Sequence, residues 1–122
     1  LVDAHGLQIA AGGYAQSISL LERPNRPTAI FAGSDLQAMG VYEAARQLGL
    51  RIPEDVSVVG FDDVQPAAFL GPALTTVRQP LQDMARAAVR MLVEALTDDV
   101  IQPHIIMPTS LVVRNSTQQL EG

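Results

Sequence analysis

Polar side chains that could hold a small molecule follow two of the short apolar runs in this sequence. Ser34 and Asp35 come directly after the first run, and Asp62 and Asp63 come directly after the second. If both runs are parallel strands, their carboxyl ends meet at one edge of a sheet, where open α/β sheets bind ligands. A carboxylate accepts two hydroxyl hydrogens at once. The sequence therefore predicts a site for a polyol, sugar or ribose at this edge of the sheet, with Asp62 as the leading contact.

The same residues allow other interpretations. Asp62 alone can cap a turn by accepting hydrogen bonds from nearby backbone amides. Asp62 and Asp63 together could hold a hard cation such as Mg²⁺. Phosphoryl-transfer sites of that kind usually include a lysine, and the sequence has none, so we expect no metal site. The nucleophile elbow, phosphate loop, dinucleotide fingerprint and zinc-protease motif are all missing from the sequence, so we predict neither catalysis nor a cofactor.

Composition narrows the class of protein. The chain of 122 residues is 48% hydrophobic and 17% charged, which fits one globular domain with a core. Its net charge is −5, and its eight basic residues are all arginines, which argues against binding to a nucleic-acid backbone. It contains no cysteine, which excludes disulfides and thiolate zinc sites. We find no signal or membrane-anchor pattern and expect a cytoplasmic protein without a membrane partner.

Short apolar runs alternate with helical patterns, and this alternation predicts an α/β fold with a parallel sheet. The pair Ser34 and Gln37 is a capping box, which predicts that a helix begins there. Proline is tolerated in the first helical turn, so the longest helix should open at Pro80. The predicted helices are 11–22, from 34 and from 80, and the predicted strands are 28–32, 56–61, 74–77, 105–107 and 111–113, with a strand stub at 1–4.

Large apolar side chains outside this pattern are candidates for a protein contact. Met39 is most simply a core residue of the helix that begins at Ser34. Phe69 and Leu70 lie in a short proline-bounded loop, where an exposed apolar pair would favour a dimer contact. His5 and His104 are far apart in the sequence, and we expect both to be loop or surface residues.

Four segments together carry a resemblance to a known family. They are Pro27–Gly40, Gly49–Asp63, Leu74–Pro80 and Leu111–Thr117. In this order and approximate spacing, they resemble the effector domain of the lactose-repressor (LacI/GalR) family of bacterial transcription regulators. The resemblance implies two α/β lobes, joined by crossover segments, that close around a small molecule like a type I periplasmic binding protein.

The resemblance covers only the later part of such a domain, so the parallel-sheet, three-layer lobe should be incomplete. Residues 1–77 look like most of the C-terminal lobe, and residues 78–109 look like a helix and strand of the N-terminal lobe. Residues 110–119 look like the return to the C-terminal lobe. We expect residues 120–122 to be extra residues left by cloning. We also expect the first crossover and the DNA-binding helix-turn-helix to be missing from this sequence.

The resemblance also implies roles for single residues. Asp62 matches the acid that contacts the effector in family members. Ser34 falls where relatives often have an asparagine that binds the ligand, and Gln8 falls near a position where several relatives stack an aromatic ring on it. The dimer face of the family includes the helix with Met39 and the loop with Phe69 and Leu70. The implied partners are a small effector, such as a sugar, and a second copy of the chain, with DNA bound only through the missing helix-turn-helix.

Two other functions remain open. A sugar-binding component of a transporter would share the fold, although the segments ending at Pro80 and Thr117 look like the repressor version. An enzyme of the receiver or phosphatase type would use Asp62 and Asp63 with a metal ion, and its activity would be sensitive to a chelator.

Overall fold

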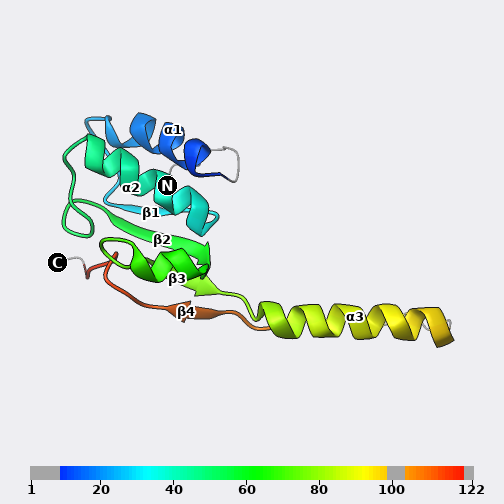
Figure 1. Cartoon of the computed structure of the whole chain (residues 1–122). Helices are drawn as coiled ribbons and strands as arrows, with labels where there is room; N and C mark the ends of the chain where they lie inside the picture. Colours follow the sequence, from blue (N-terminus) through cyan, green and yellow to red (C-terminus); the bar gives the residue numbers. More distant parts are fainter. Residues whose placement is uncertain (1–8, 99–103, 120–122) are drawn as a thin grey trace. The chain divides into compact units, whose positions relative to one another are not determined.

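The computed structural model of the protein describes residues 9–98 and 104–119. The chain forms two compact units, one of residues Leu1–Arg78 with Leu111–Gly122 and one of residues Gln79–Ser110. The assignment of these units to the two lobes of a binding protein stays a prediction. The elements, drawn in Figure 1, are α1 (Ala10–Leu21), β1 (Ala29–Phe31), α2 (Asp35–Gln47), β2 (Ser57–Asp62), the 3₁₀ helix η1 (Gln65–Phe69), β3 (Thr75–Arg78), α3 (Leu81–Asp98) and β4 (Ser110–Val112).

The first unit is built on a parallel sheet, as the sequence predicts. The strand order is β1-β2-β3-β4, and β2 pairs in parallel with both β1 and β3. The predicted strand 56–61 is therefore an interior strand, observed one residue later at Ser57–Asp62. The predicted strand 74–77 is likewise observed as Thr75–Arg78. An α/β fold with a partial parallel sheet is thus confirmed.

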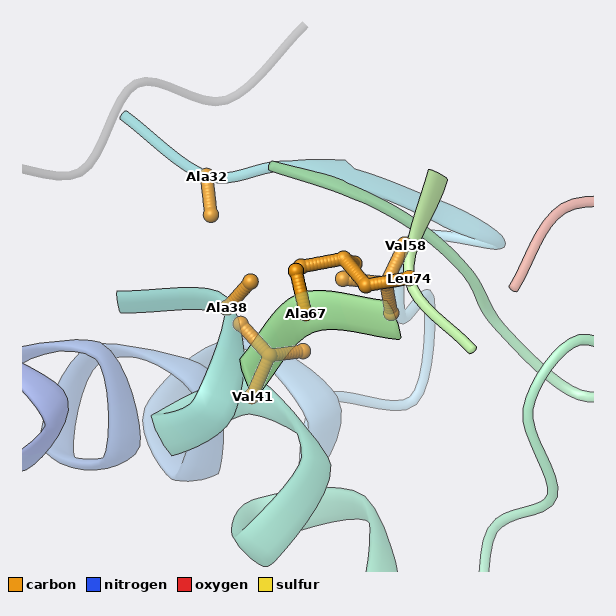
Figure 2. Packing of buried hydrophobic residues seen from close by; sticks show 6 residues of the cluster. All are labelled: Ala32, Ala38, Val41, Val58, Ala67 and Leu74. Atoms are coloured by element: carbon orange, nitrogen blue, oxygen red, sulfur yellow. The ribbon is translucent and has the colours of Figure 1, made fainter. Parts of the chain in front are cut away.

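The core lies between this sheet and the helices α1, α2 and η1 (Figure 1). Val58 from β2 and Val41 from α2 are both buried there. The small side chains of Ala38 in α2 and Ala67 in η1 pack in this core together with the larger Leu74. Figure 2 shows the cluster that results: Ala32, Ala38, Val41, Val58, Ala67 and Leu74.

The opposite face of the sheet differs from the expectation. In the expected three-layer lobe both faces of β2 would be covered, yet burial alternates along this strand. Val58 and Gly60 are buried, while Val59 and Phe61 are partly exposed, and Phe31 of β1 is 64% exposed. The helices that pack on the sheet in the described part of the chain lie on one face, so these residues supply two of the three expected layers.

The helices α1 and α2 pack closely because glycines face each other where they meet. A Cβ atom added to Gly40 would lie 2.1 Å from the carbonyl oxygen of Ala10 and 2.3 Å from the nitrogen of Tyr14. A Cβ atom added to Gly13 would lie 2.2 Å from the carbonyl oxygen of Gln37. These contacts leave no room for a side chain, which explains the glycines at Gly13 of α1 and Gly40 of α2.

The segment after β4 joins the sheet through Ser116, which is fully buried. Its carbonyl oxygen accepts from Val58 N at 2.8 Å, and its hydroxyl donates to Val58 O at 2.6 Å. The same hydroxyl accepts from Thr75 N at 2.8 Å. Ser116 therefore links β2 and β3 near their amino-terminal ends, and it satisfies backbone groups of Val58 and Thr75.

The second unit contains α3 and the chain that follows it. Pro80 precedes the helix instead of opening it, and its carbonyl oxygen accepts from Met84 N at 2.9 Å. The predicted strand at Ile105–Met107 is wrong, because residues 104–109 have no regular structure. A groove of about 340 Å³ lies between α3 and this segment, lined mainly by apolar residues and by His104. Among the described residues, no helix has the length and hydrophobicity to cross a bilayer.

The glycine contact between α1 and α2 gives a first prediction. We expect Gly40→Ala to lower the free energy of unfolding by about 3 kcal/mol, since overpacking outweighs the better helix propensity of alanine. Urea denaturation of the two proteins measures the difference. The control is Gly71→Ala, where an added Cβ meets no atom within 4 Å. Equal stability of both variants would show that the two helices can separate without cost.

Candidate functional site

The carboxyl ends of the parallel strands bring the predicted polar residues to one edge of the sheet. Asp62 ends β2 and pairs with Arg78, which ends β3. Ser34 lies just beyond β1 and precedes the first residue of α2. The edge therefore carries a hydroxyl, a carboxylate and a guanidinium. Contact between these groups and a ligand stays a prediction.

Ser34 is the N-cap of α2, as the capping-box pattern predicts. Its hydroxyl oxygen accepts a hydrogen bond from Gln37 N at 3.1 Å, and the residue is 6% exposed. This bond satisfies one of the backbone amides that a helix start leaves without a partner. The capping role accounts for a serine at this position without a ligand.

Asp35 lies below the edge and not on its surface. It is fully buried. Its Oδ1 accepts from the Thr76 hydroxyl at 2.6 Å, and its Oδ2 accepts from Val64 N at 2.8 Å. Gly60 makes room for it, because a Cβ atom there would lie 2.2 Å from Asp35 Oδ1. The carboxylate of Asp35 thus joins the start of α2 to β3 and to the loop after β2.

Asp62 occupies the expected place at the end of an interior parallel strand. The residue is partly exposed. Its φ of 116° is positive, a conformation that a residue other than glycine adopts only when its surroundings impose it. Such outliers are concentrated at binding sites, where strain accompanies a fixed side-chain direction.

Asp63 also has a positive φ, 56°, and its carboxylate is bound on both oxygens. Arg78 Nε donates to Oδ2 at 2.6 Å, and an Nη atom of Arg114 donates to Oδ1 at 2.7 Å. The side chain of Asp63 is 9% exposed, against 56% for Arg78 and 18% for Arg114. Burial raises the pKa of Asp63, but the hydrogen bonds and charges of Arg114 and Arg78 outweigh it and hold the pKa below its ordinary value.

These bonds bear on the magnesium alternative. With both oxygens of Asp63 engaged by arginines, Asp62 and Asp63 do not form a pair of carboxylates open to a cation. Within residues 9–98 and 104–119, no group of three or more acidic, histidine or cysteine side chains is placed to hold a metal ion. The positions of Asp62 and Asp63 favour a hydrogen-bonding site over a metal site.

The other predicted site residues lie elsewhere or outside the description. Gln8 and His5 precede the described residues, as does the predicted strand stub at 1–4. Phe69 is 81% exposed at the end of η1, whereas Leu70 is only partly exposed and packs on the core cluster. The expected exposed pair is therefore a single exposed phenylalanine. Met39 is half-buried on α2.

Sequence reasoning missed the partners of Asp63. Arg78 and Arg114 both stand in the segments used for the family resemblance, but neither was given a role. The only feature of the sequence that could have indicated these two partners is their residue type, since arginine is the residue best suited to bind a carboxylate in a fixed geometry. The bonds of Arg114 to Leu74 O at 2.8 Å and to Asp63 could not be read from sequence spacing.

Comparisons with known proteins show the family of this chain. The periplasmic binding protein-like domain family matches residues 2–117. A curated relative, an uncharacterized HTH-type transcriptional regulator of Streptomyces limosus, is 50% identical over 109 residues, which are 88% of this chain and 30% of the relative. The chain spans about a third of the length of the curated relatives that it matches.

Two solved structures show the same fold. A LacI family transcriptional regulator from Enterococcus faecium with bound ribose has a TM-score of 0.84 at 28% identity, covering 93% of this chain and 42% of that one. The lac repressor dimer bound to operator and an anti-inducer has a TM-score of 0.83 at 31% identity, covering 89% of this chain and 38% of that one.

The ion pairs of Asp63 make the stability of the chain depend on pH. A carboxylate with a lowered pKa adds stability above its unfolded pKa of about 3.9 and loses it as pH falls through the lower folded value. We expect Asp63→Asn to lower the free energy of unfolding by about 2 kcal/mol at pH 7. The difference from the unmodified chain should shrink as pH falls below about 3.9 and vanish only below the folded pKa of Asp63. Urea titrations at several pH values measure this difference.

The matched control is Asp83→Asn, which removes the exposed pair with Arg86 at 3.4 Å. It should change stability by less than about 0.5 kcal/mol at every pH, because such surface pairs contribute little. A difference for Asp63→Asn that stays constant from pH 7 to pH 3 would mean that its charge is not what binds the arginines.

Proposed function

Because this chain belongs to the periplasmic-binding-protein-like domain family, in the form found in LacI-type regulators, we propose that it senses a small effector for a bacterial transcription regulator. The effector is a sugar or another small polar molecule. The observation that carries this proposal is the placement of Asp62, a partly exposed residue with a positive φ at the carboxyl end of an interior parallel strand. Relatives named as HTH-type regulators favour this function over transport.

In this proposal, the unit that contains Asp62 is one wall of the effector site. The whole regulator would have a second lobe that closes the site, to which residues 78–109 contribute, and a helix-turn-helix that binds DNA. The protein would act in the cytoplasm without catalysis or a cofactor. Effector binding would favour one arrangement of the lobes, and this can occur only if the effector has different affinities for the two arrangements.

Asp62 would accept hydrogen bonds from ligand hydroxyls, and Ser34 and Gln8 would line the same site. Ser34 already accepts the bond from Gln37 N, so its contribution to a ligand is the donation of its hydroxyl hydrogen. A carboxylate that accepts two hydroxyls orients a polyol more strongly than a neutral group, because charge-assisted hydrogen bonds are the stronger class. Asp62 is therefore the residue whose neutralisation tests the proposal.

We expect Asp62→Asn in the full-length regulator to weaken sugar binding by about 10- to 100-fold, the equivalent of one or two charge-assisted hydrogen bonds. Calorimetric titration with ribose, glucose, maltose and cellobiose identifies the sugar and measures the loss. Asp55→Asn is the control, since Asp55 pairs with Arg51 away from the site. The isolated chain, with one wall of the site, should bind the same sugar weakly or not at all. Tight binding by the isolated chain or by Asp62→Asn would contradict the proposal.

The proposal includes a homodimer whose contact uses Met39, Phe69 and Leu70. Phe69 would contribute most to the free energy of dimer formation, because its side chain is 81% exposed and would bury the largest apolar area in the contact. Met39 and Leu70 would surround it as partly covered neighbours.

We expect Phe69→Asp to shift the chain from dimer to monomer in sedimentation experiments, with a dimer dissociation constant raised at least about 100-fold by burial of a charge in an apolar contact. Asn25→Asp adds the same charge on an exposed loop and should leave the dimer intact. If the mass of Phe69→Asp equals that of the unmodified chain, the contact lies elsewhere.

A further inference from the structure

The carboxylate of Asp63 is engaged by arginines and largely shielded from solvent. Arg78 Nε donates to Oδ2 at 2.6 Å, and an Nη atom of Arg114 donates to Oδ1 at 2.7 Å. The Asp63 side chain is only 9% exposed. It nevertheless directly follows Asp62, the residue proposed to contact the effector. We therefore expect any effect of Asp63 on effector binding to act through Asp62 and not through contact with the ligand.

Arg78 is linked to both of these aspartates. In the parallel pairing of β2 with β3, Arg78 is the residue opposite Asp62. The side chain of Arg78 bonds to Asp63, the next residue of the chain. The end of β3 is thus joined to the end of β2 by the sheet register at one residue and by an ion pair at the next. The peptide group between Asp62 and Asp63 lies between these two links.

The backbone at these two aspartates has a conformation that depends on its surroundings. Asp62 has a φ of 116° and Asp63 a φ of 56°. The second value lies in the left-handed region, which aspartate enters more readily than most residues, whereas the first lies outside it. A residue other than glycine keeps such a conformation where surrounding contacts favour it. The bond from Val64 N to the buried Asp35, at 2.8 Å, holds the backbone on the following side.

The two arginines hold Asp63 in different surroundings. Arg114 is 18% exposed and also donates to Leu74 O at 2.8 Å, so it is fixed to the first unit at a second point. Arg78 is 56% exposed, and an ion pair with such an exposed partner contributes little to stability. Loss of the Arg78 bond should therefore change the local conformation at the end of β2 with little effect on the stability of the fold.

We propose that Asp63 is a positioning residue for effector binding: its two bonds to arginines hold the turn after β2 in one backbone conformation and so fix the direction of the Asp62 side chain. This inference rests on the proposed function, in which Asp62 contacts the effector. Without the bonds, the turn populates other conformations, and the apparent dissociation constant rises by the inverse of the fraction that can still bind. A fraction of about one tenth corresponds to an affinity about tenfold weaker.

The conformational part of this proposal can be tested on the chain without a ligand. Arg78→Met removes the donor to Asp63, and nitrogen-15 relaxation measures the motion of the Asp62 and Asp63 amides. We expect order parameters of about 0.85 in the parent, the value of a rigid backbone. In Arg78→Met they should fall below about 0.6, or the two amides should show slower exchange between conformations. The urea midpoint should stay close to that of the parent.

The matched control for this experiment is Arg46→Met. It makes the same substitution in the first unit and removes a similarly exposed ion pair, in which Arg46 lies 2.6 Å from Glu43. This variant should leave the motion of Asp62 and Asp63 as it is in the parent. The control therefore separates the Arg78 contact from a general effect of losing a surface arginine.

The functional part needs the full-length regulator and the sugar that it binds among ribose, glucose, maltose and cellobiose. We expect Asp63→Asn and Arg78→Met each to raise the dissociation constant by about tenfold. In a protein that already carries Asp62→Asn, either change should alter the affinity by less than about twofold, because residues that act through one contact are not additive. General structural damage would instead weaken binding by the same factor in both backgrounds.

The proposal is overturned if Arg78→Met leaves either the motion of Asp62 and Asp63 or the sugar affinity as in the parent. It is also overturned if the loss caused by Arg78→Met is the same with and without Asp62→Asn. Should Asp63→Asn prove unfolded, the Arg78→Met results decide alone. A regulator that binds none of the four sugars, or that binds them equally well with Asp62→Asn, contradicts the proposed function instead, and the relaxation experiment then decides whether Asp63 positions Asp62.

Discussion

The buried carboxylate of Asp35 is the contact on which the candidate site depends. A carboxylate without solvent is tolerated only when its oxygens are hydrogen-bonded, and here the Thr76 hydroxyl and Val64 N supply those bonds at 2.6 and 2.8 Å. Gly60 allows the close approach. Because these partners come from β3 and the loop after β2, one side chain at the start of α2 aligns three elements. The bond to Val64 N holds the backbone directly after Asp62 and Asp63, the two residues with positive φ at the end of β2.

Local sequence patterns predicted the parts of the site that depend on neighbouring residues. The Ser34 and Gln37 pair placed the start of α2, since a cap and its amide lie within one helical turn. The apolar, β-branched run before Asp62 gave an interior parallel strand to within one residue. Both patterns involve residues that are close in the sequence, and in this chain the tertiary contacts favour the same helix start and the same strand as the local patterns do.

Contacts between distant residues were not predictable in the same way. Asp63 meets Arg78 and Arg114 across 15 and 51 residues, and no periodicity in the sequence encodes such a meeting. The apolar run Ile105–Met107 reads as a strand, but strand formation needs a partner strand for its backbone, and none pairs with it in the described part of the chain. Phe69 and Leu70 look alike in the sequence, yet η1 directs one outward and packs the other on the core.

We propose above that Asp62 contacts the effector at the carboxyl edge of the sheet. A crystal structure of the full-length protein with its bound sugar tests this most directly. We expect one or two sugar hydroxyls to lie about 2.5–3.0 Å from the carboxylate oxygens of Asp62. A sugar bound at another place, or one that leaves Asp62 without contact, would contradict it.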